Sequence, residues 1–488
     1  MTKVLLFLFV TCQKVTSYKL RVMKVVMSND PHSGMDGGMF GKRVLGYGGD
    51  FDMTICSSSG GEKQYCCKTG ELNTSDDNWE LGETNYFIGH QLNGCENFDI
   101  SPSSTVSVKI QHQGSDGGKI SFITLRGALR NKNELICSVN KKLDDSESFV
   151  ASCSPNNRKI DTSNDNERSK ECMGRSEFCE IEINKFSFVG AHNAGTGMSG
   201  SIKPVECLFK NHDLTFPEQL DFGTRFFDMD VAYSQTLPGC NGLETVHGKG
   251  SMYYCFGQVK HLLNQIIDWA NDNPSEVILL HFGSLYKGNV TLSPLIKQIQ
   301  ESFSVPGVKL NKIFQETSKW PTLGEAIDRN ERVFIFIKQE YTDTLSVNDN
   351  DILDYIKVYK VDDEDVGKPK PILRKGWASF ASTYGSGKIG SDCDDVVDTV
   401  SNLCQNLKAD FIKVATYGTP WKSLSLVLKK SSICIDTYAR MCNVRAQKIM
   451  RVCKKNQPVL NVVLSDFPNY PSTSDKTLPE LVDKENLS

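Results

Sequence analysis

Short apolar segments alternate with longer helical segments from residue 181 onward, and this alternation limits the fold more than any other feature of the sequence. Strands interleaved with helices form βαβ units around a parallel sheet. About 300 residues of this pattern suit a (β/α)8 barrel of the TIM type, in which residues at the carboxyl ends of the strands carry the chemistry. The predicted strands are Phe186–Ala191, Phe226–Val231, Val277–Phe282, Val333–Ile337, Phe411–Ala415 and Val459–Phe467. The predicted helices are Val259–Asn271, Leu292–Phe303, Val396–Leu407, Thr437–Lys454 and Leu478–Lys484.

The preceding residues, 18–153, have a different pattern, with short alternating segments. Val106–Ile110 and Ile120–Leu125 flank a Gly/Asp turn, which predicts an antiparallel hairpin within a small β-sandwich. Residues 154–180 are polar and predict a linker. The expected fold class is α/β, with a TIM-type barrel catalytic domain over residues 181–488 preceded by a small disulfide-bonded β-sandwich.

Residues 1–17 have the pattern of a secretory signal peptide. The basic start Met1–Lys3 precedes the apolar run Val4–Val10, and Val15–Ser17 offers a small-residue cleavage site. The alternative is a buried strand at the start of a domain. Sequons at Asn73 and Asn289 agree with export and predict a secreted glycoprotein.

Of the 17 cysteines in the chain, 16 would remain after removal of this peptide. Six of them precede residue 160 and ten follow it. Even numbers on both sides predict disulfides within two separate domains of an exported protein, with the pairing left open. A zinc site is disfavoured because the sequence has no Cys-x-x-Cys pair and no histidine pair at metal-ligand spacing.

Charge and hydropathy exclude two classes of protein. The formal net charge is −4, from 55 basic and 59 acidic side chains, which argues against a general nucleic-acid binder. No run approaches the roughly 18–20 apolar residues of a membrane span, so we expect no transmembrane segment. Nothing in the sequence indicates an oligomeric state.

A His-Asn pair, His192 and Asn193, follows the predicted strand Phe186–Ala191. An imidazole moves protons near neutral pH, and an asparagine carbonyl binds hard cations. These residue types predict catalysis or metal binding at the end of the strand. The alternative is a buried structural histidine.

Two carboxylates, Asp228 and Asp230, lie two residues apart on the next predicted strand, Phe226–Val231. Side chains at this spacing point to the same side of an extended strand, so the pair needs a cation or a shared proton. The alternative is a solvated strand face. His247 stands before a glycine at a probable strand end and is a candidate for a second proton-transfer group.

The order of these residues resembles the X region of phosphatidylinositol-specific phospholipase C over about residues 185–285. A later segment, Val459–Phe467, is similar to the last barrel strand of that family. The resemblance implies a TIM-type barrel and a phosphodiesterase of the phospholipase C type. The motifs that carry it are, in chain order, His192-Asn193, Gly223-x-Arg225-x-x-Asp228-x-Asp230, His247-Gly248 and Asn273-Pro274-Ser275-Glu276-Val277-Ile278.

The resemblance implies that His192 and His247 flank a phosphodiester. An inositol hydroxyl attacks phosphorus while one histidine assists its deprotonation and the other protonates the departing glycerol oxygen. Diacylglycerol and a cyclic inositol phosphate are the implied products. The resemblance also implies that Asp466 orients His192 through a carboxylate–imidazole pair.

A calcium site built from Asn193, Asp228 and Asp230 is implied as well, with another divalent cation as the alternative. Calcium-dependent members of the family carry a further Glu at the end of the strand Val277–Phe282. This sequence has His281-Phe282-Gly283 there.

Two basic residues, Arg225 and Lys338, are predicted to bind the substrate. The alternative for Lys338 is a surface lysine whose aliphatic stem covers apolar surface. Tyr384 and Tyr417 lie in loops after predicted strands, where aromatic rings stack on sugars, but neither is assigned a role.

The sequence therefore predicts a secreted phosphodiesterase that cleaves phosphatidylinositol-type lipids at a membrane surface, by His-His acid/base catalysis with a metal ion. One alternative is an enzyme on the same barrel that cleaves sphingomyelin-like or glycerophosphodiester substrates. Another alternative is a catalytically weak lipid-binding relative, which the missing glutamate motivates.

Overall fold

The computed structural model divides the chain into two compact units, residues 1–160 and 161–488. The predicted signal peptide and the sequons at Asn73 and Asn289 lie outside the residues that the structure describes. The described residues are 18–20, 22–27, 50–58, 64–72, 84–88, 92, 95, 98–100, 105–113, 118–126, 134–143, 147–155, 171–197, 209–233, 240, 242–249, 252–286, 292–312, 320–338, 355–359, 380–382, 393–405, 411–417, 435–457, 459–470, 472–473 and 476–487.

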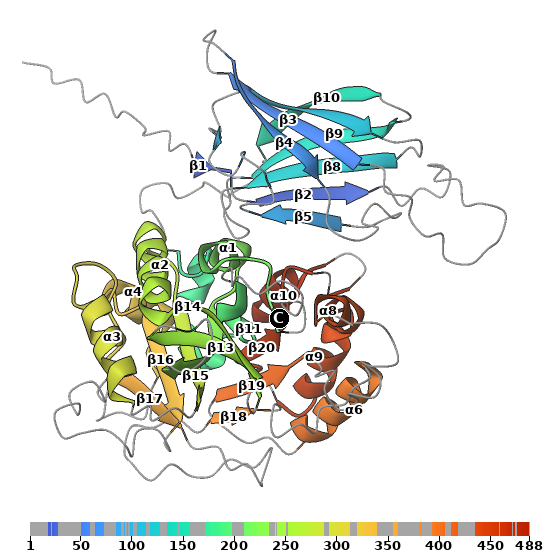
Figure 1. Ribbon diagram of the computed structural model, residues 1–488. Coiled ribbons are helices and arrows are strands. Elements are labelled where there is room, and N and C mark those ends of the chain that lie inside the picture. Colours follow the sequence, from blue (N-terminus) through green and yellow to red (C-terminus); the bar gives the residue numbers. More distant parts are fainter. Residues whose placement is uncertain are drawn as a thin grey trace, which may run out of the picture. The chain divides into compact units, whose positions relative to one another are not determined.

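The first unit is a curled antiparallel sheet of eight strands in the order β4-β3-β7-β10-β9-β8-β2-β5 (Figure 1). Alternate side chains of its strands enter one core, as Val106, Val108 and Ile110 of β7 do. Two short strands, β1 (Tyr18–Lys19) and β6 (Asp99–Ile100), form a separate antiparallel pair. The sheet strands are β2 (Val22–Met27), β3 (Asp50–Ser58), β4 (Tyr65–Leu72), β5 (Thr84–Ile88), β7 (Thr105–Gln113), β8 (Gly118–Arg126), β9 (Glu134–Leu143) and β10 (Ser148–Pro155).

The predicted hairpin between Val106–Ile110 and Ile120–Leu125 is wrong, although both segments are strands. The first lies in β7, which pairs with β3 and β10, and the second lies in β8, which pairs with β2 and β9. Ile110 and Ile120 nevertheless belong to the same core. Alternation shows which side chains face a core, but it does not select the neighbouring strand.

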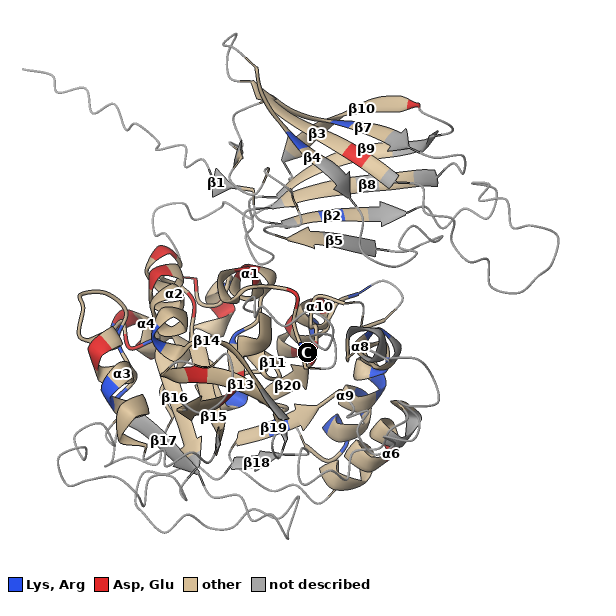
Figure 2. Cartoon of the chain, in the orientation of Figure 1, with Lys and Arg blue, Asp and Glu red and all other residues tan. Residues whose placement is uncertain are grey.

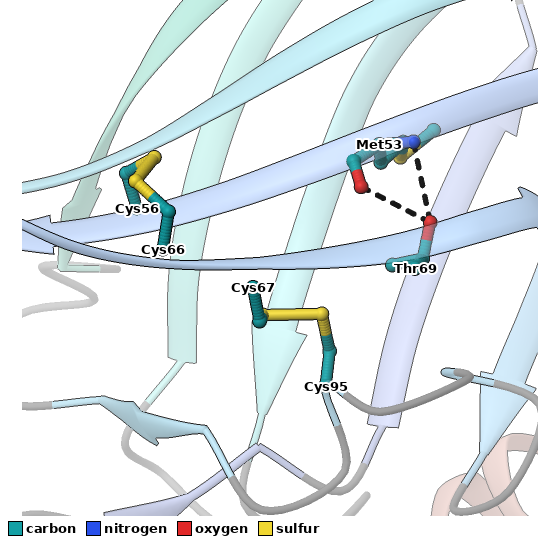
Figure 3. Close-up of a disulfide and its surroundings, with 6 residues drawn as sticks. All are labelled: Met53, Cys56, Cys66, Cys67, Thr69 and Cys95. Carbon is teal, nitrogen blue, oxygen red and sulfur yellow. Dashed lines mark hydrogen bonds between the residues drawn. A yellow bond between two sulfur atoms is a disulfide. The ribbon is translucent and has the colours of Figure 1, made fainter.

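Three disulfides cross-link the described part of the first unit. Successive residues Cys66 and Cys67 of β4 point to opposite faces of the sheet. Cys66 therefore bonds to Cys56 of the adjacent strand β3, and Cys67 bonds to Cys95 outside the sheet (Figure 3). The three pairs are Cys56–Cys66, Cys67–Cys95 and Cys137–Cys153.

The pairing of β3 with β4 is irregular at Met53, where the register shifts between Asp52 and Thr54. The buried hydroxyl of Thr69 meets both backbone groups of Met53 there, accepting from its N–H at 3.2 Å and donating to its carbonyl at 3.1 Å (Figure 3). The side chain thus satisfies backbone groups that the register shift leaves without strand partners on β4.

The second unit contains parallel strands in the order β17-β16-β15-β12-β11-β20-β19-β18 (Figure 1). This order follows the chain if β17 and β18 are taken as neighbours, as in a barrel. No pairing between these two strands occurs among the described residues, so the parallel α/β architecture is shown but barrel closure is not. The strands are β11 (Phe188–Ala191), β12 (Phe226–Tyr233), β15 (Ile278–Tyr286), β16 (Val333–Lys338), β17 (Ile356–Tyr359), β18 (Phe380–Ser382), β19 (Phe411–Ala415) and β20 (Val462–Ser465).

Helices follow most of these strands, as the sequence predicts. The predicted helix Thr437–Lys454 is in fact two helices, α8 and α9, separated by a turn at Val444 and Arg445. No helix in the described part of the chain has the length and hydropathy needed to cross a membrane. The helices are α1 (Phe216–Phe222), α2 (Val259–Asp272), α3 (Ser293–Phe303), α4 (Leu323–Asp328), α6 (Cys393–Cys404), α8 (Ile435–Asn443), α9 (Ala446–Lys454) and α10 (Leu478–Asn486).

An antiparallel hairpin of β13 (Leu243–Lys249) and β14 (Met252–Gln258) adds to the edge of β12 beyond the parallel path. Neither strand is predicted from the sequence as a hairpin partner. A strand end is expected near His247, whereas His247 lies inside β13 and opposite Tyr254 of β14.

The predicted linker, residues 154–180, is too long at both ends. Strand β10 extends to Pro155, and residues 172–179 are closed into a loop by a disulfide. Phe178 in this loop packs into the core of the second unit. The polar composition of this segment predicts a linker, but the packing of Phe178 and the Cys172–Cys179 disulfide are enough to fix the loop.

Four disulfides lie in the described part of the second unit. Two of them connect α6 with α8 and α9, two helices far along the chain. The expectation of disulfides in both halves of the chain is confirmed, while Cys207 and Cys434 lie outside the described residues. The four pairs are Cys172–Cys179, Cys240–Cys255, Cys393–Cys442 and Cys404–Cys453.

Aromatic rings pack together within the parallel sheet. The ring centroids of Phe226 and Phe336 are 6.3 Å apart, those of Phe336 and Phe411 are 5.1 Å apart, and Trp320 stacks on Phe411 at 5.7 Å. In the second unit, charged residues lie mostly on helices, and the strands are largely uncharged (Figure 2). Charged side chains on these strands are therefore exceptions that need partners.

Candidate active site

The first functional pair is His192 with Asp466, at the carboxyl ends of β11 and β20. Parallel pairing places Ala191 opposite Ser465, so the next residue of each strand follows at the same edge. The Nδ1 atom of His192 lies 2.9 Å from Oδ1 of Asp466, and both side chains are buried. A carboxylate on Nδ1 holds the proton there and leaves the lone pair on Nε2.

The backbone on both sides of this pair is held in an unusual conformation. Asn193 and Phe467, the residues after His192 and Asp466, have φ angles of 49° and 45°. Asparagine adopts this left-handed region readily, whereas for phenylalanine it costs on the order of 1–3 kcal/mol. The amide of Asn443 donates to the carbonyls of Asp466 and Phe467 at 2.9 and 3.0 Å and fixes the turn.

Asn211 connects the loop before α1 to the same pair. Its side-chain nitrogen donates to Oδ1 of Asp466 at 2.8 Å, and its carbonyl accepts from the N–H of Phe467 at 3.0 Å. Its own N–H donates to Oγ1 of Thr196 at 2.8 Å. Asn211 thus helps to orient Asp466 by donating to the same carboxylate oxygen that faces His192.

The second histidine, His247, reaches the site from the β13–β14 hairpin. Its ring centroid lies 6.4 Å from that of His192, and the two rings meet edge to face at 74°. The Nδ1–H of His247 donates to the carbonyl of Phe209 at 2.7 Å, which again leaves Nε2 as the atom for proton transfer. Burial lowers the pKa of His247 to about 4, and a positive charge on His192 adds to this effect.

A third histidine, His212, supports the first from behind and is not predicted by the sequence analysis. Its Nε2–H donates to the backbone carbonyl of His192 at 2.5 Å. The side chain is buried, and burial lowers the pKa of His212 to about 4. His212 is therefore neutral at pH 7 and acts as a hydrogen-bond donor.

Tyr417, which follows β19, stacks on His192 with ring centroids 3.9 Å apart and planes inclined by 14°. From the sequence, this loop tyrosine has no assigned role, and a sugar ring is the stacking partner considered for it. In the structure the ring instead limits the rotation of the His192 imidazole. Tyr384 lies outside the described residues.

Asp228 lies one strand away from His192, in the middle of β12. Its Oδ1 accepts a hydrogen bond from Nδ1 of His281 on β15, and its Oδ2 lies 3.3 Å from Nζ of Lys413 on β19. All three side chains are buried. Burial raises the pKa of the Asp228 carboxyl, but the Lys413 ammonium and the His281 imidazole outweigh burial and hold that pKa well below its usual range.

Asp230 does not share the surroundings of Asp228. The register between β12 and β15 shifts after Met229, so Asp230 lies opposite Ser284 rather than Gly283. Asp230 is half-buried, whereas Asp228 is buried. The residue left without a partner at this shift is Gly283, so the bulge lies in β15, and the periodicity of β12 itself is uninterrupted between the two carboxylates.

The predicted calcium ligands do not fit a hard divalent cation. Asp228 already has a partner on each carboxylate oxygen, and one of these partners is a positive ammonium group. The side-chain nitrogen of Asn193 lies 3.5 Å from Oδ1 of Asn211, which turns that amide toward a neighbour. Calcium takes six to eight oxygen ligands, and this set supplies too few that are not already bonded to nitrogen donors.

The two basic residues predicted to bind substrate have different outcomes. Arg225 precedes β12, at the amino end of the sheet, and its Nε donates to Glu276 at 2.8 Å. Its buried guanidinium also donates to backbone carbonyls, so its placement contradicts a role in substrate binding. Lys338 is the last residue of β16, and its side chain lies outside the described part of the structure.

A cluster of three metal-ligating residue types occurs elsewhere in the described residues, formed by Cys240, Glu244 and Cys255. The two cysteines are joined in a disulfide, so their sulfur atoms are not thiolate ligands. The cluster therefore adds no metal site.

The important residues missed by the sequence analysis fall into two groups. Lys413 and His281 are single polar residues inside otherwise apolar predicted strands, a pattern that indicates a buried polar group with a specific partner. Asn211, His212 and Asn443 lie far along the chain from the residues they hold, and nothing in their local sequence marks them.

A family model described as PI-PLC X 1 matches residues 178–365. This finding confirms the resemblance predicted from the sequence. The matched region includes His192, Asp228, His247 and His281. It ends before Lys413 and Asp466, which therefore join the site from outside the matched region.

Two curated relatives come from Arthroderma benhamiae. A PI-PLC X domain-containing protein 1 is 31% identical over 172 residues, which cover 34% of this chain and 50% of the relative. An uncharacterized secreted protein is 26% identical over 182 residues, covering 35% of this chain and 36% of the relative. The chain thus spans half the length of the first relative and about a third of the second.

Solved structures of phosphatidylinositol-specific phospholipases C are also similar to this chain. A mutant of the Staphylococcus aureus enzyme has 12% sequence identity and a TM-score of 0.44, covering 64% of this chain and 97% of that chain. The Listeria monocytogenes enzyme has 13% identity and a TM-score of 0.36, covering 63% of this chain and 95% of that chain.

Proposed function

We propose that the second unit is a phosphodiesterase that cleaves phosphatidylinositol-type lipids between phosphorus and the glycerol oxygen. The match of residues 178–365 to the PI-PLC X model supports this proposal. The observation that carries the proposal is the approach of two imidazoles, His192 and His247, to 6.4 Å between ring centroids. An in-line displacement at phosphorus needs two proton-transfer groups, one for the attacking oxygen and one for the leaving oxygen.

His192 is the general base in this proposal. Its Nδ1–H is held by Asp466, so Nε2 accepts the proton of an inositol hydroxyl as that oxygen attacks phosphorus. Asp466 then faces the positive charge that develops on the ring. Stacking by Tyr417 and the hydrogen bond from His212 keep the ring from turning away during the transfer.

His247 is the general acid. As the bond between phosphorus and the glycerol oxygen breaks, Nε2 of protonated His247 gives its proton to that oxygen, and diacylglycerol leaves. In the cyclic inositol phosphate, phosphorus is bonded to two inositol oxygens, the original ester oxygen and the oxygen of the attacking hydroxyl. Burial keeps most of the free protein in the neutral form of His247 at pH 7. The negative charge of a bound phosphodiester raises the pKa of His247 and favours the protonated form.

Export and membrane contact belong to the same proposal. Seven described disulfides and a relative named as a secreted protein support an extracellular location. The substrate is then a lipid headgroup at a membrane surface. We also propose that β17 and β18 close the parallel sheet into a barrel.

The test is incubation of the full chain with phosphatidylinositol vesicles, followed by product analysis. We expect diacylglycerol and cyclic inositol phosphate from the unaltered protein, and at least a 100-fold lower rate from His192→Ala. Sphingomyelin and glycerophosphodiester vesicles are run in parallel. Cleavage of those lipids alone would contradict phosphatidylinositol as the substrate and favour the alternative substrates. Binding to vesicles without any product would contradict an enzyme and favour a lipid-binding protein.

A further inference from the structure

We infer that Lys413 is the resident cation of this site and that Asp228 holds Lys413 in place, so that the site works without a divalent metal ion. The inference rests on the proposed function, because it assigns a role in phosphodiester cleavage. It replaces the expected calcium site, whose principal carboxylate is Asp228.

Three strands of the parallel sheet contribute to this arrangement, two of them neighbours and the third, β19, separated from β12 by β11 and β20 in the strand order. Asp228 comes from β12, His281 from the paired strand β15 at the same register, and Lys413 from β19. Lys413 Nζ lies 3.3 Å from Oδ2 of Asp228, and the side chains of Lys413 and Asp228 are 5% and 9% exposed. A bridging contact between three strands at this depth fixes the ammonium group within the sheet rather than on its surface.

The position of the missing glutamate provides a second, independent observation. A Cβ atom on Gly283 would lie 3.0 Å from Oδ1 of Asp228 and 3.1 Å from Cε1 of His281. Both contacts are tighter than an ordinary van der Waals contact. With His281 and Asp228 in place, a side chain at position 283 would have to displace one of them by a few tenths of an ångström, so this position is crowded for a fourth acidic ligand.

Charge explains why the ammonium group and a divalent cation are alternatives. A cation bound to Asp228 would lie within a few ångströms of the Lys413 ammonium, where repulsion is strong because the surroundings are buried. It would also have to displace the hydrogen bond from His281. A buried ion pair is weak evidence for a stabilising role, because desolvation of both charges offsets much of their attraction. A charge retained at this cost in an active site is better explained by function.

Lys413 is suited to the task that calcium has in the predicted site. An ammonium group carries a full positive charge and three N–H donors, and lysine is a common ligand of phosphate groups. Asp228 is next to His192 in the strand order, because Ala191 pairs with Phe227. The positive charge therefore lies in the strand layer that carries the proposed base, where it attracts the phosphoryl oxygens.

The first experiment measures metal dependence on the full-length protein. We expect the rate of phosphatidylinositol cleavage to change less than twofold on addition of EGTA or EDTA, and calcium titrated by calorimetry to give no site that Asp228→Asn removes. A rate that is lost with chelator and restored by calcium would overturn the inference and leave the proposed function intact.

The second experiment removes the ammonium group with Lys413→Met, which keeps the length of the side chain. We expect a 100-fold or larger loss in kcat/KM and at least a tenfold weaker competitive inhibition by inorganic phosphate, with Lys413→Arg restoring part of both. The matched control is Lys297→Met, which removes an exposed lysine from α3 and leaves both quantities unchanged.

Circular dichroism shows whether Lys413→Met folds. If Lys413→Met does not fold, as judged by circular dichroism, calorimetry on the unaltered protein and Asp228→Asn decides the question alone, because calcium binding through Asp228 contradicts the inference and its absence supports it. If the folded variant retains normal kcat/KM and phosphate inhibition, Lys413 is only structural and the inference fails. If no protein cleaves any phosphodiester, the proposed function fails, whatever calorimetry shows.

Discussion

The two ends of the parallel sheet both contain a buried carboxylate paired with a cation, yet they differ in how the cation is used. At the amino end, Arg225 lies 2.8 Å from Glu276. Nearer the carboxyl end, Lys413 lies 3.3 Å from Asp228. All four side chains are less than 10% exposed, so burial alone does not distinguish the two pairs.

The amino-end pair is connected mainly to backbone. Nη1 of Arg225 donates to the carbonyls of Leu220 and Thr224, and its guanidinium carbon lies 4.6 Å from the ring centroid of Trp269. Arg332 behaves similarly, donating to the carbonyls of Ala270, Asn273 and Glu276. These arginines close the turns before two strands, and most of their hydrogen-bond partners are backbone carbonyls, which do not titrate.

The carboxyl-end pair is connected to other titratable side chains. Asp228 also accepts from His281, and it lies one strand from His192, which is paired with Asp466. A buried ion pair is therefore a candidate functional site when titratable side chains surround it. When its other partners are backbone carbonyls, the pair has a structural role. Substitutions at the two ends should therefore separate activity from stability.

The largest expected effect is at the carboxyl end, in His247→Ala. Loss of the general acid lowers kcat/KM by about 10²- to 10⁴-fold, while the free energy of unfolding changes little because the ring forms one hydrogen bond to a backbone carbonyl. The measurement is turnover per folded molecule, with unfolding followed in urea. His261→Ala, which removes an exposed histidine from α2, is the control and retains full turnover.

The converse result is expected at the amino end, in Arg225→Met. Removal of the guanidinium leaves Glu276 buried without its cation, which lowers the free energy of unfolding by about 3–5 kcal/mol. The rate per folded molecule stays within twofold, because Arg225 does not reach the histidines. In the control Arg329→Met, loss of the partly exposed pair with Glu331 costs about 1 kcal/mol or less. If Arg225→Met were stable but lost most of its turnover, the structural role assigned to the amino-end pair would be contradicted.

The positions of the strands, which depend on the periodicity of apolar residues, can be predicted from the sequence. Phe411–Ala415 has the observed bounds of β19, and the other predicted strands of the second unit overlap observed ones. His192 is predicted at a strand end from the residues that follow the apolar run. Its closeness to Asp466 is expected only from the family resemblance, because 274 residues separate the two along the chain.

Other features depend on pairing that periodicity does not encode. The register shift between β12 and β15 places Asp230 opposite Ser284 rather than Gly283, and the β13–β14 hairpin places His247 near His192 from outside the parallel path. Long-range hydrogen bonds decide both arrangements. The same limit explains the wrong hairpin in the first unit, where alternation identifies strands correctly but their partners incorrectly.

A smaller effect is expected from acid, again at the carboxyl end. Burial lowers the pKa of His212 from its ordinary value of 6.5 to about 4 in the folded protein. The unfolded chain therefore takes up the proton first, so stability is full above pH 6.5 and declines as pH falls from 6.5 toward 4. A difference of this size corresponds to about 3 kcal/mol.

Urea unfolding at several pH values measures this decline, and His212→Gln should remove about 3 kcal/mol of it while retaining a side-chain N–H donor for the His192 carbonyl. The control His261→Gln retains the profile of the unaltered protein. An unchanged profile in His212→Gln would show that His212 is protonated in the folded protein or that another group causes the decline.

The smallest expected effect tests the support of the His192–Asp466 pair, in Asn211→Ala. Asp466 keeps His192 but loses the amide that donates to the same carboxylate oxygen at 2.8 Å, so the orientation of His192 becomes less restricted. We expect kcat to fall about tenfold with KM unchanged, because a hydrogen bond to a charged group contributes about 1.5–3 kcal/mol and part of it is replaced by water. Asn469→Ala, which removes an amide bonded to Asp213 instead, is the matched control. Equal turnover in the two variants would mean that the carboxyl end holds its base through His192 and Asp466 alone.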